Sequence, residues 1–129
     1  MTVIRNSNQV KQAIDFNGIG NEKIHPSDID AVLEFNNEAL ILFEVKRINN
    51  ELPTGQRLLL ERITDSWHTE KAITLFVNHN FKDDTIDIPL VECWVTKYYF
   101  KGSWYKCNEP LKKQLKKILS KWKISKMQL

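Results

Sequence analysis

A carboxylate and an amine stand two residues apart within one strongly apolar stretch of this sequence. Residues 39–48 read ALILFEVKRI, and Glu44-Val45-Lys46 within them is the only E-x-K in the chain. Side chains two positions apart in a strand point to the same face, so both charged groups would emerge together. Charges inside an apolar strand are costly without partners or water, which favours a chemical role for the pair.

The turn before this stretch can bring a second carboxylate to the same place. Residues 28–35, DIDAVLEF, alternate as a strand does, and Asn36-Asn37 is a turn signal. Asp30 and Glu44 each lie seven residues from Asn37. A symmetrical hairpin therefore sets the two carboxylates opposite each other, about 5 Å apart at Cβ. Asp28 is the alternative to Asp30, but it lies two residues further from the turn.

Two facing carboxylates repel each other unless a cation lies between them. Oxygen ligands without a nearby imidazole or thiolate favour Mg²⁺ over Zn²⁺, and Mn²⁺ can take the place of Mg²⁺. Lys46 cannot bind a metal while protonated, but it can hold an attacking water or an anionic oxygen. The trio therefore predicts metal-assisted hydrolysis of a phosphodiester bond. The competing interpretation is a surface ion pair between Glu44 and Lys46 on an edge strand, contributing little.

These residues resemble the core of a known family. The stretch from Ser27-Asp28-Ile29-Asp30 to Glu44-Val45-Lys46-Arg47 is similar to the PD-(D/E)XK nuclease superfamily, in its Holliday-junction resolvase and VRR-NUC-like branches. The resemblance covers residues 25–78 and implies a restriction-endonuclease-like core. It implies that Asp30, Glu44 and the Val45 carbonyl bind the metal and that Lys46 orients the nucleophile. Gln56 occupies the place of a glutamine that the superfamily often carries on the next helix.

The chain also departs from the family pattern. Several branches carry a further acidic ligand on the first helix, yet residues 6–14 contain no acid. Asp15 and Glu22 are the candidates for this ligand, so the number of metals stays open. His25 can serve as an auxiliary base or phosphate contact, or it is an ordinary loop histidine.

The remaining sequence supplies the elements that would position the site. We expect helices over residues 6–15, 55–67 and 109–124, a strand over 72–78, and a hairpin over 88–106 that turns at Lys101-Gly102-Ser103. Thr54 can cap the second helix, whose apolar face would consist of Leu58, Leu59, Ile63 and Trp67. The last helix would be amphipathic, with an apolar face that consists of Leu111, Leu115, Ile118, Leu119 and Trp122. This order predicts one domain, residues 1–129, of α/β or α+β class, with a mixed sheet flanked by helices.

Charge is divided unevenly along the chain. Residues 1–96 carry 9 basic and 15 acidic side chains, whereas residues 97–129 carry ten lysines and one acid. A basic end suggests a polyanionic partner, although a solvated helix face has the same composition. We expect Lys112 and Lys116 on the last helix to follow a DNA backbone, and Arg47 and Arg57 to hold phosphates.

Six aromatic residues lie close together in the expected late hairpin, with lysines between them. They can stack on unpaired bases, or they fill a core or a dimer contact. The six are Trp94, Tyr98, Tyr99, Phe100, Trp104 and Tyr105.

The function expected from these patterns is that of a Mg²⁺-dependent DNA endonuclease. By analogy, cutting two strands calls for two active sites, which indicates a homodimer. No apolar run approaches the ~20 residues that span a bilayer, and the first residues lack the apolar stretch of a signal peptide. We therefore expect no membrane association and a cytoplasmic location. The alternatives are a catalytically inactive nucleic-acid-binding module, a protein-interaction domain with an incidental E-V-K, and the same chemistry on RNA.

Overall fold

The computed structural model describes residues 17–20, 27–82 and 87–124 of the chain. The described elements are β1 (Ala31–Phe35), β2 (Ala39–Arg47), α1 (Thr54–Ser66), β3 (Ala72–His79), the 3₁₀ turn η1 (Leu90–Glu92), β4 (Trp94–Phe100), β5 (Ser103–Pro110) and α2 (Leu111–Lys121). The expected helix over residues 6–15 lies outside the described residues. No helix in the described part of the chain has both the length and the apolar character needed to cross a bilayer.

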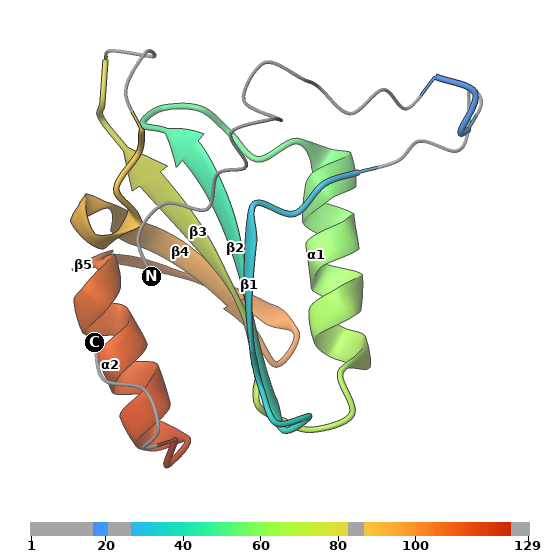
Figure 1. Ribbon diagram of the computed structural model, residues 1–129, viewed down its shortest axis with the longest axis vertical. Coiled ribbons are helices and arrows are strands. Elements are labelled where there is room, and N and C mark those ends of the chain that lie inside the picture. The colour runs from blue at the N-terminus through green and yellow to red at the C-terminus, as the bar shows by residue number, and fades with distance from the viewer. Residues whose placement is uncertain (1–16, 21–26, 83–86, 125–129) are drawn as a thin grey trace, which may run out of the picture.

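The five strands form one sheet in the order β1-β2-β3-β4-β5. β2 and β3 run parallel and are joined through α1, whereas every other neighbouring pair is antiparallel. α1 covers one face of this sheet and α2 covers the other (Figure 1). The predicted α+β class and the mixed sheet flanked by helices are confirmed.

The β1–β2 hairpin has the register that the sequence predicts. Asn36 and Asn37 have φ angles of 50° and 63°, which is the left-handed conformation that both central residues of a type I′ turn require. Pairing runs from Phe35 with Ala39 to Ala31 with Phe43, so partners are equidistant from Asn37. β1 begins at Ala31 rather than at residue 28. The chain bends at Asp30, where backbone pairing with β2 has ended. The Asp30 carboxylate accepts a hydrogen bond from the Val45 N–H of β2 instead.

The late hairpin spans residues 94–110 rather than the predicted 88–106, although its turn lies where it was predicted. It turns at Lys101 and Gly102, where both φ angles are positive and Phe100 pairs with Ser103. β4 begins only at Trp94, after η1, while β5 continues as far as Pro110. The last helix accordingly starts at Leu111, because Pro110 still has an extended backbone, with φ −55° and ψ 137°.

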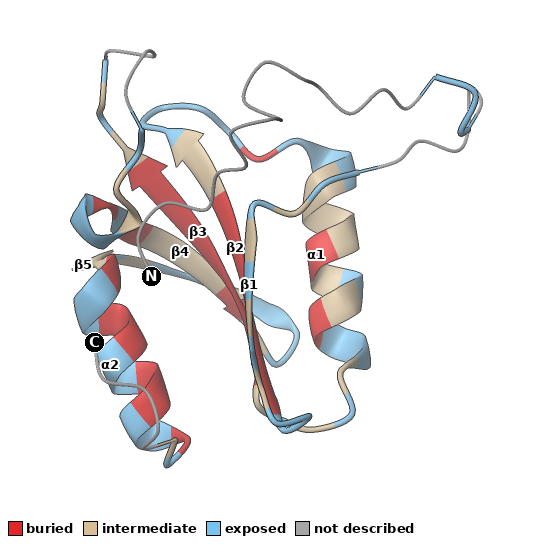
Figure 2. Ribbon diagram, in the orientation of Figure 1, coloured by how far each residue is buried: buried red, intermediate tan, exposed pale blue. Residues whose placement is uncertain are grey.

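The larger core lies between the sheet and α2. The predicted apolar face of this helix is confirmed, since its members are all buried while the lysines of the helix are exposed (Figure 2). The buried residues of this face are Leu111, Leu115, Ile118, Leu119 and Trp122.

The smaller core lies between the sheet and α1, and here the predicted helix face is partly wrong. Leu60 and Thr64 are the buried residues of α1, whereas the four residues expected there are only half-buried. The physical reason is a polar contact at the centre of the interface. The Thr64 hydroxyl lies 2.7 Å from that of Thr74 on β3 and donates to the Leu60 carbonyl. The expected cap is also wrong, because Pro53 occupies the N-cap position and Thr54 is already helical.

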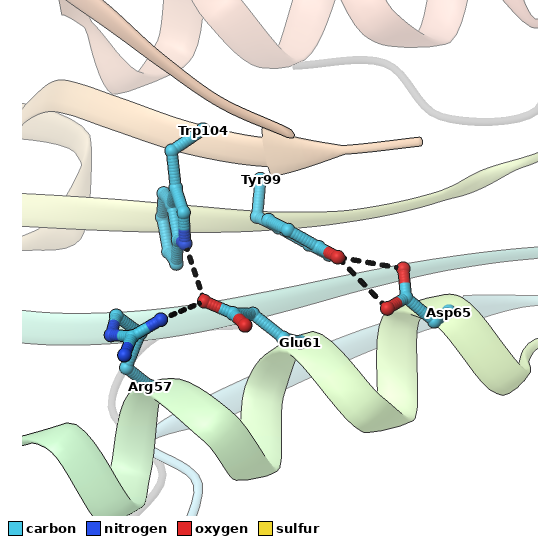
Figure 3. Close-up of polar contacts among 5 residues, drawn as sticks. All are labelled: Arg57, Glu61, Asp65, Tyr99 and Trp104. Atoms are coloured by element: carbon cyan, nitrogen blue, oxygen red, sulfur yellow. Dashed lines mark hydrogen bonds and ion pairs between the residues drawn. The ribbon is translucent and has the colours of Figure 1, made fainter. Parts of the chain in front are cut away.

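Tyr99 on β4 and Trp104 on β5 donate further hydrogen bonds to α1 (Figure 3). Tyr99 donates to both carboxylate oxygens of Asp65, at 2.9 and 2.8 Å, and burial together with this bond raises the pKa of Tyr99 to about 12. The Trp104 indole N–H donates to Glu61 Oε2 at 2.7 Å, and Arg57 donates to the same oxygen at 2.6 Å. The bond from Trp104 lowers the pKa of Glu61. The position of α1 above the sheet thus depends on acidic side chains as well as on apolar contacts.

We predict that Glu61→Ala lowers the free energy of unfolding by ~1–3 kcal/mol, because it leaves the half-buried Trp104 N–H without an acceptor. Urea unfolding measures the change. The matched control is Glu70→Ala, which removes an exposed acid paired with Lys101 at 3.6 Å and should cost at most ~0.5 kcal/mol. Equal losses in the two variants would contradict a specific role for Glu61.

Candidate active site

The two faces of β2 have different partners. Ala39, Ile41 and Phe43 belong to the core beneath α2, whereas Leu40 and Leu42 belong to the core beneath α1. Strand alternation continues the second row into Glu44 and Lys46. Both charged residues therefore lie on the α1 face, at the carboxyl end of β2. Lys46 Nζ lies 3.4 Å from Glu44 Oε1.

Asp30 joins this pair from the other arm of the hairpin. The Val45 backbone N–H donates to Asp30 Oδ2 at 2.7 Å, and the register of β1 on β2 sets Asp30 against Glu44. The two carboxyl groups are close enough that the charge of Asp30 adds to burial in raising the pKa of Glu44. The structure thus brings together Asp30, Glu44, Val45 and Lys46. Asp28 is exposed and stands two residues outside this contact.

Glu44 is a buried acid with an incomplete set of partners. It is 1% exposed, and its Oε2 has no hydrogen-bond partner among the described residues. Burial is the largest cause that raises its pKa, followed by the charge of Asp30, while the charge of Lys46 opposes both. A carboxylate oxygen buried without a donor is costly, and a cation or a hydrogen-bond donor at this atom would lower that cost.

Gln56 lies in the first turn of α1, one helical turn before Leu60 and on the same side of the helix. Its Oε1 is likewise buried without a hydrogen-bond partner. The described residues contain one further oxygen of this kind, Glu109 Oε2, which lies on the α2 side of the sheet, where Lys117 contacts the other oxygen of the same carboxylate. Two of the three unsatisfied oxygens therefore belong to residues that the sequence selects for the site.

The donor set suits a hard divalent cation. Within residues 17–20, 27–82 and 87–124, no three side chains of His, Cys, Asp or Glu converge. The two carboxylates and the Val45 carbonyl offer oxygen ligands only, as Mg²⁺ and Mn²⁺ prefer. The proposed further ligands Asp15 and Glu22, and the candidate base His25, lie outside the described residues.

The four basic residues proposed to contact phosphate are not gathered at this centre. Arg47 follows Lys46 directly and is exposed, so strand alternation turns it to the other face. Arg57 is paired with Glu61 at 2.6 Å and is 38% exposed. Lys112 and Lys116 are exposed on α2, on the opposite side of the sheet from Glu44 (Figure 1).

Asn78 is a neighbour of the centre that sequence reasoning missed. It pairs with Lys46 across the parallel strands, and its Nδ2 donates to the Lys46 carbonyl at 3.2 Å. Its Oδ1 accepts a hydrogen bond from the Thr96 hydroxyl. The available signal was an amide that directly follows the apolar run AITLFV, at the carboxyl end of a parallel strand.

Comparison with known proteins gives no match to a protein-family model, to a curated protein or to a solved structure.

We predict that Glu44→Gln stabilises the protein when divalent metal is absent. The pKa of Glu44 is raised in the folded protein, so the folded state favours the protonated side chain. The stability that this form contributes is present below the ordinary glutamate pKa, about 4.3, and is lost as the pH rises through the pKa that Glu44 has in the folded protein. At about pH 7 the free energy of unfolding of the variant should exceed that of wild type by ~1 kcal/mol or more, and this difference should shrink at about pH 4.

Urea unfolding in EDTA at the two pH values measures this gap. Glu51→Gln, at an exposed position, is the control and should match wild type at both. A wild type more stable than Glu44→Gln at neutral pH would show that the carboxylate is satisfied by other means.

Proposed function

We propose that this protein is a Mg²⁺-dependent DNA endonuclease that hydrolyses phosphodiester bonds. The observation that carries the proposal is the juxtaposition of Asp30 with the buried, incompletely partnered Glu44, beside the Lys46 ammonium. The resemblance of residues 25–78 to PD-(D/E)XK nucleases, in their Holliday-junction resolvase and VRR-NUC-like branches, supports the same assignment.

The ligands in this proposal are oxygen atoms. Asp30 and Glu44 would hold the metal with the Val45 carbonyl. Gln56, in the first turn of α1, would add its buried carboxamide oxygen, which has no hydrogen-bond partner among the described residues. The metal, when bound, lowers the pKa of a water molecule and screens the charge that builds on the phosphate. Binding a cation would also relieve the repulsion between the two acids and satisfy Glu44 Oε2.

Lys46 carries the remaining chemical role. Its side chain is 27% exposed, so the ammonium reaches the rim of the site while its stem stays on the sheet. From there it can donate to an attacking water or to a non-bridging phosphate oxygen. Glu44, 3.4 Å away, fixes the ammonium on the side of the carboxylates. The amine thus positions the nucleophile and favours the extra negative charge of the transition state.

The surface that would meet DNA lies at one end of the sheet. Lys46 pairs with Asn78, Asn78 with Trp94 and Trp94 with Pro110, which directly precedes α2. The first turn of α2, with exposed Lys112, therefore begins at the same end of the sheet as the reactive centre. A DNA backbone that crosses this end can contact Lys112 and Lys46 although they belong to opposite faces. Lys116, one turn further along α2, extends the contact for a longer duplex.

The biological setting follows from the same proposal. A homodimer with two active sites suits the cutting of two strands or of a junction. A cytoplasmic location would give the enzyme access to DNA. The sheet ends in β1 on one side and β5 on the other.

We predict that millimolar Mg²⁺ or Mn²⁺ raises the melting temperature of the wild type by about 2–5 °C, because the metal binds the folded state. Glu44→Gln should lose most of this response, and Asp30→Asn should weaken it. Differential scanning fluorimetry measures the shifts, with Glu51→Gln as the control that keeps the wild-type response. Equal shifts in wild type and Glu44→Gln would place the metal elsewhere.

Cleavage by wild type and Lys46→Ala tests the activity itself. Branched, linear and single-stranded DNA are incubated with Mg²⁺ or with EDTA. We expect metal-dependent cutting by the wild type, and a loss of at least about 100-fold in Lys46→Ala with DNA binding retained. The matched control is Lys71→Ala. Lys71 is 35% exposed and lies 3.7 Å from Glu38, so it resembles Lys46 in exposure and pairing but precedes β3 at the other end of the sheet.

Each alternative function has its own outcome in this assay. DNA binding without cutting by the wild type would favour an inactive binding module on the same fold. No affinity for DNA at low salt would favour a protein-interaction domain. Cutting confined to RNA of the same structures would retain the chemistry and change the substrate.

A further inference from the structure

A hollow of about 380 Å³ lies next to the candidate active site, where β3 ends and β4 begins. This volume falls within the range of small-molecule sites, about 300–1,000 Å³. Aromatic rings and amide side chains make up most of its wall. Among the residues that line it are Asn78, His79, Phe81, Glu92, Trp94 and Asn108.

The hollow lies at the same end of the sheet as the reactive centre. One part of its wall shares the face of that centre, whereas Phe81 packs against the core beneath α2. Asn78 follows Phe76 by two positions on β3, and Phe76 packs in the core beneath α1. Asn78 also pairs with Lys46 on one side and with Trp94 on the other. Neighbouring strands are about 4.8 Å apart, so the hollow begins one strand away from Lys46.

A β-bulge turns the Trp94 side chain toward the α1 face of the sheet. Thr96 is an extra residue of β4 relative to β3, since Val77 pairs with Val95 and Phe76 with Lys97. Val95 is therefore buried beneath α2, while Trp94 turns to the α1 face and keeps 46% of its surface exposed. The Thr96 hydroxyl donates to Asn78 Oδ1 and fixes the amide that separates Trp94 from Lys46. The bulge thus places an exposed indole beside the centre without disturbing the larger core.

The wall of the hollow suits a flat, uncharged ring. The rings of His79 and Phe81 stack at a centroid distance of 5.8 Å and an interplanar angle of 28°, and Trp94 offers a further aromatic surface. None of the described lining residues is Lys or Arg, and the Glu92 carboxylate is part of the wall. A phosphate would be repelled there, whereas a base stacks on aromatic rings and bonds to amides and to a carboxylate.

We propose that this hollow receives the base of one unpaired nucleotide next to the phosphate that is cut. The inference rests on the nuclease function proposed above and narrows its substrate class. A base within a duplex is paired and stacked, so it cannot enter unless it leaves the helix. The preferred substrate is therefore DNA with an unpaired nucleotide at the cleavage position, and not a continuous duplex.

The test is a binding measurement that needs no cleavage. Fluorescence anisotropy without divalent metal compares a labelled single-stranded oligonucleotide with the matching duplex. Trp94→Ala should weaken single-strand binding about tenfold, as expected for loss of stacking on one base, and should change duplex binding less than about twofold. Trp94→Phe keeps an aromatic ring and should retain most of the affinity.

Tyr105→Ala is the matched control. Tyr105 is 45% exposed, close to the value for Trp94, but it stacks on Tyr98 on the α2 side of the sheet. Its removal should leave binding of both DNA forms within about twofold of wild type. Circular dichroism confirms that each variant is folded before it is compared.

The outcomes separate this inference from the nuclease proposal. Equal losses on single strand and duplex in Trp94→Ala, or an equal effect of Tyr105→Ala, would overturn the base pocket and leave cleavage by the Lys46 centre standing. A selective effect of Trp94→Ala in a protein that cuts no DNA would support the pocket and overturn the nuclease. A wild type that binds neither DNA form would overturn both.

Discussion

The hydrogen bond from the Val45 N–H to the Asp30 carboxylate holds the two arms of the first hairpin together at the point where chemistry is proposed. Backbone pairing of β1 with β2 ends at Ala31, and this side-chain contact takes its place. A slip of one residue in the register would send Glu44 and Lys46 to the face beneath α2. The left-handed turn at Asn36 and Asn37 therefore determines the composition of the site as well as the shape of the hairpin.

Helix α1 packs on the face of the sheet that carries Glu44 and Lys46, and several of its contacts with the sheet are polar. The hydroxyls of Thr64 and Thr74 meet inside the smaller core, and Glu61 and Asp65 accept hydrogen bonds from Trp104 and Tyr99 (Figure 3). Directional contacts of this kind fix the rotation and the height of a helix more narrowly than apolar contacts alone. This precision bears on the site, because the first turn of α1 carries Gln56.

The parts that sequence reasoning predicted well are those governed by strict periodicity. Positions two apart in β2 share a face, and symmetry about Asn37 gave the partner of Glu44, so the grouping of Asp30, Glu44 and Lys46 could be predicted without coordinates. The α2 face was equally accessible, since five apolar residues stand among lysines. For α1 the same reasoning failed, because Leu58, Leu59 and Leu60 offer three adjacent apolar residues and the buried threonine was not counted as a core residue.

Other features lay beyond the reach of the sequence for a physical reason. Pairing between β2 and β3 depends on a crossover through α1, and no local pattern states which residue of β3 meets Lys46. Only the parallel register of β2 and β3 identifies Asn78 as the neighbour of Lys46. The bulge at Thr96 was likewise invisible, because β4 reads WVTKYYF and has no apolar–polar alternation whose phase could change at the bulge.

The extra residue at Thr96 divides β4 into two segments with opposite phase. After it, Tyr98 and Phe100 contact the α2 layer, and before it Val95 does so too, although an unbroken strand would have turned Val95 away. A single insertion or deletion at this position would exchange the environments of Trp94 and Val95 and leave the phase of the following residues unchanged. The rim of the hollow can therefore be remodelled through changes in chain length at one position, independently of the hairpin that carries the carboxylates.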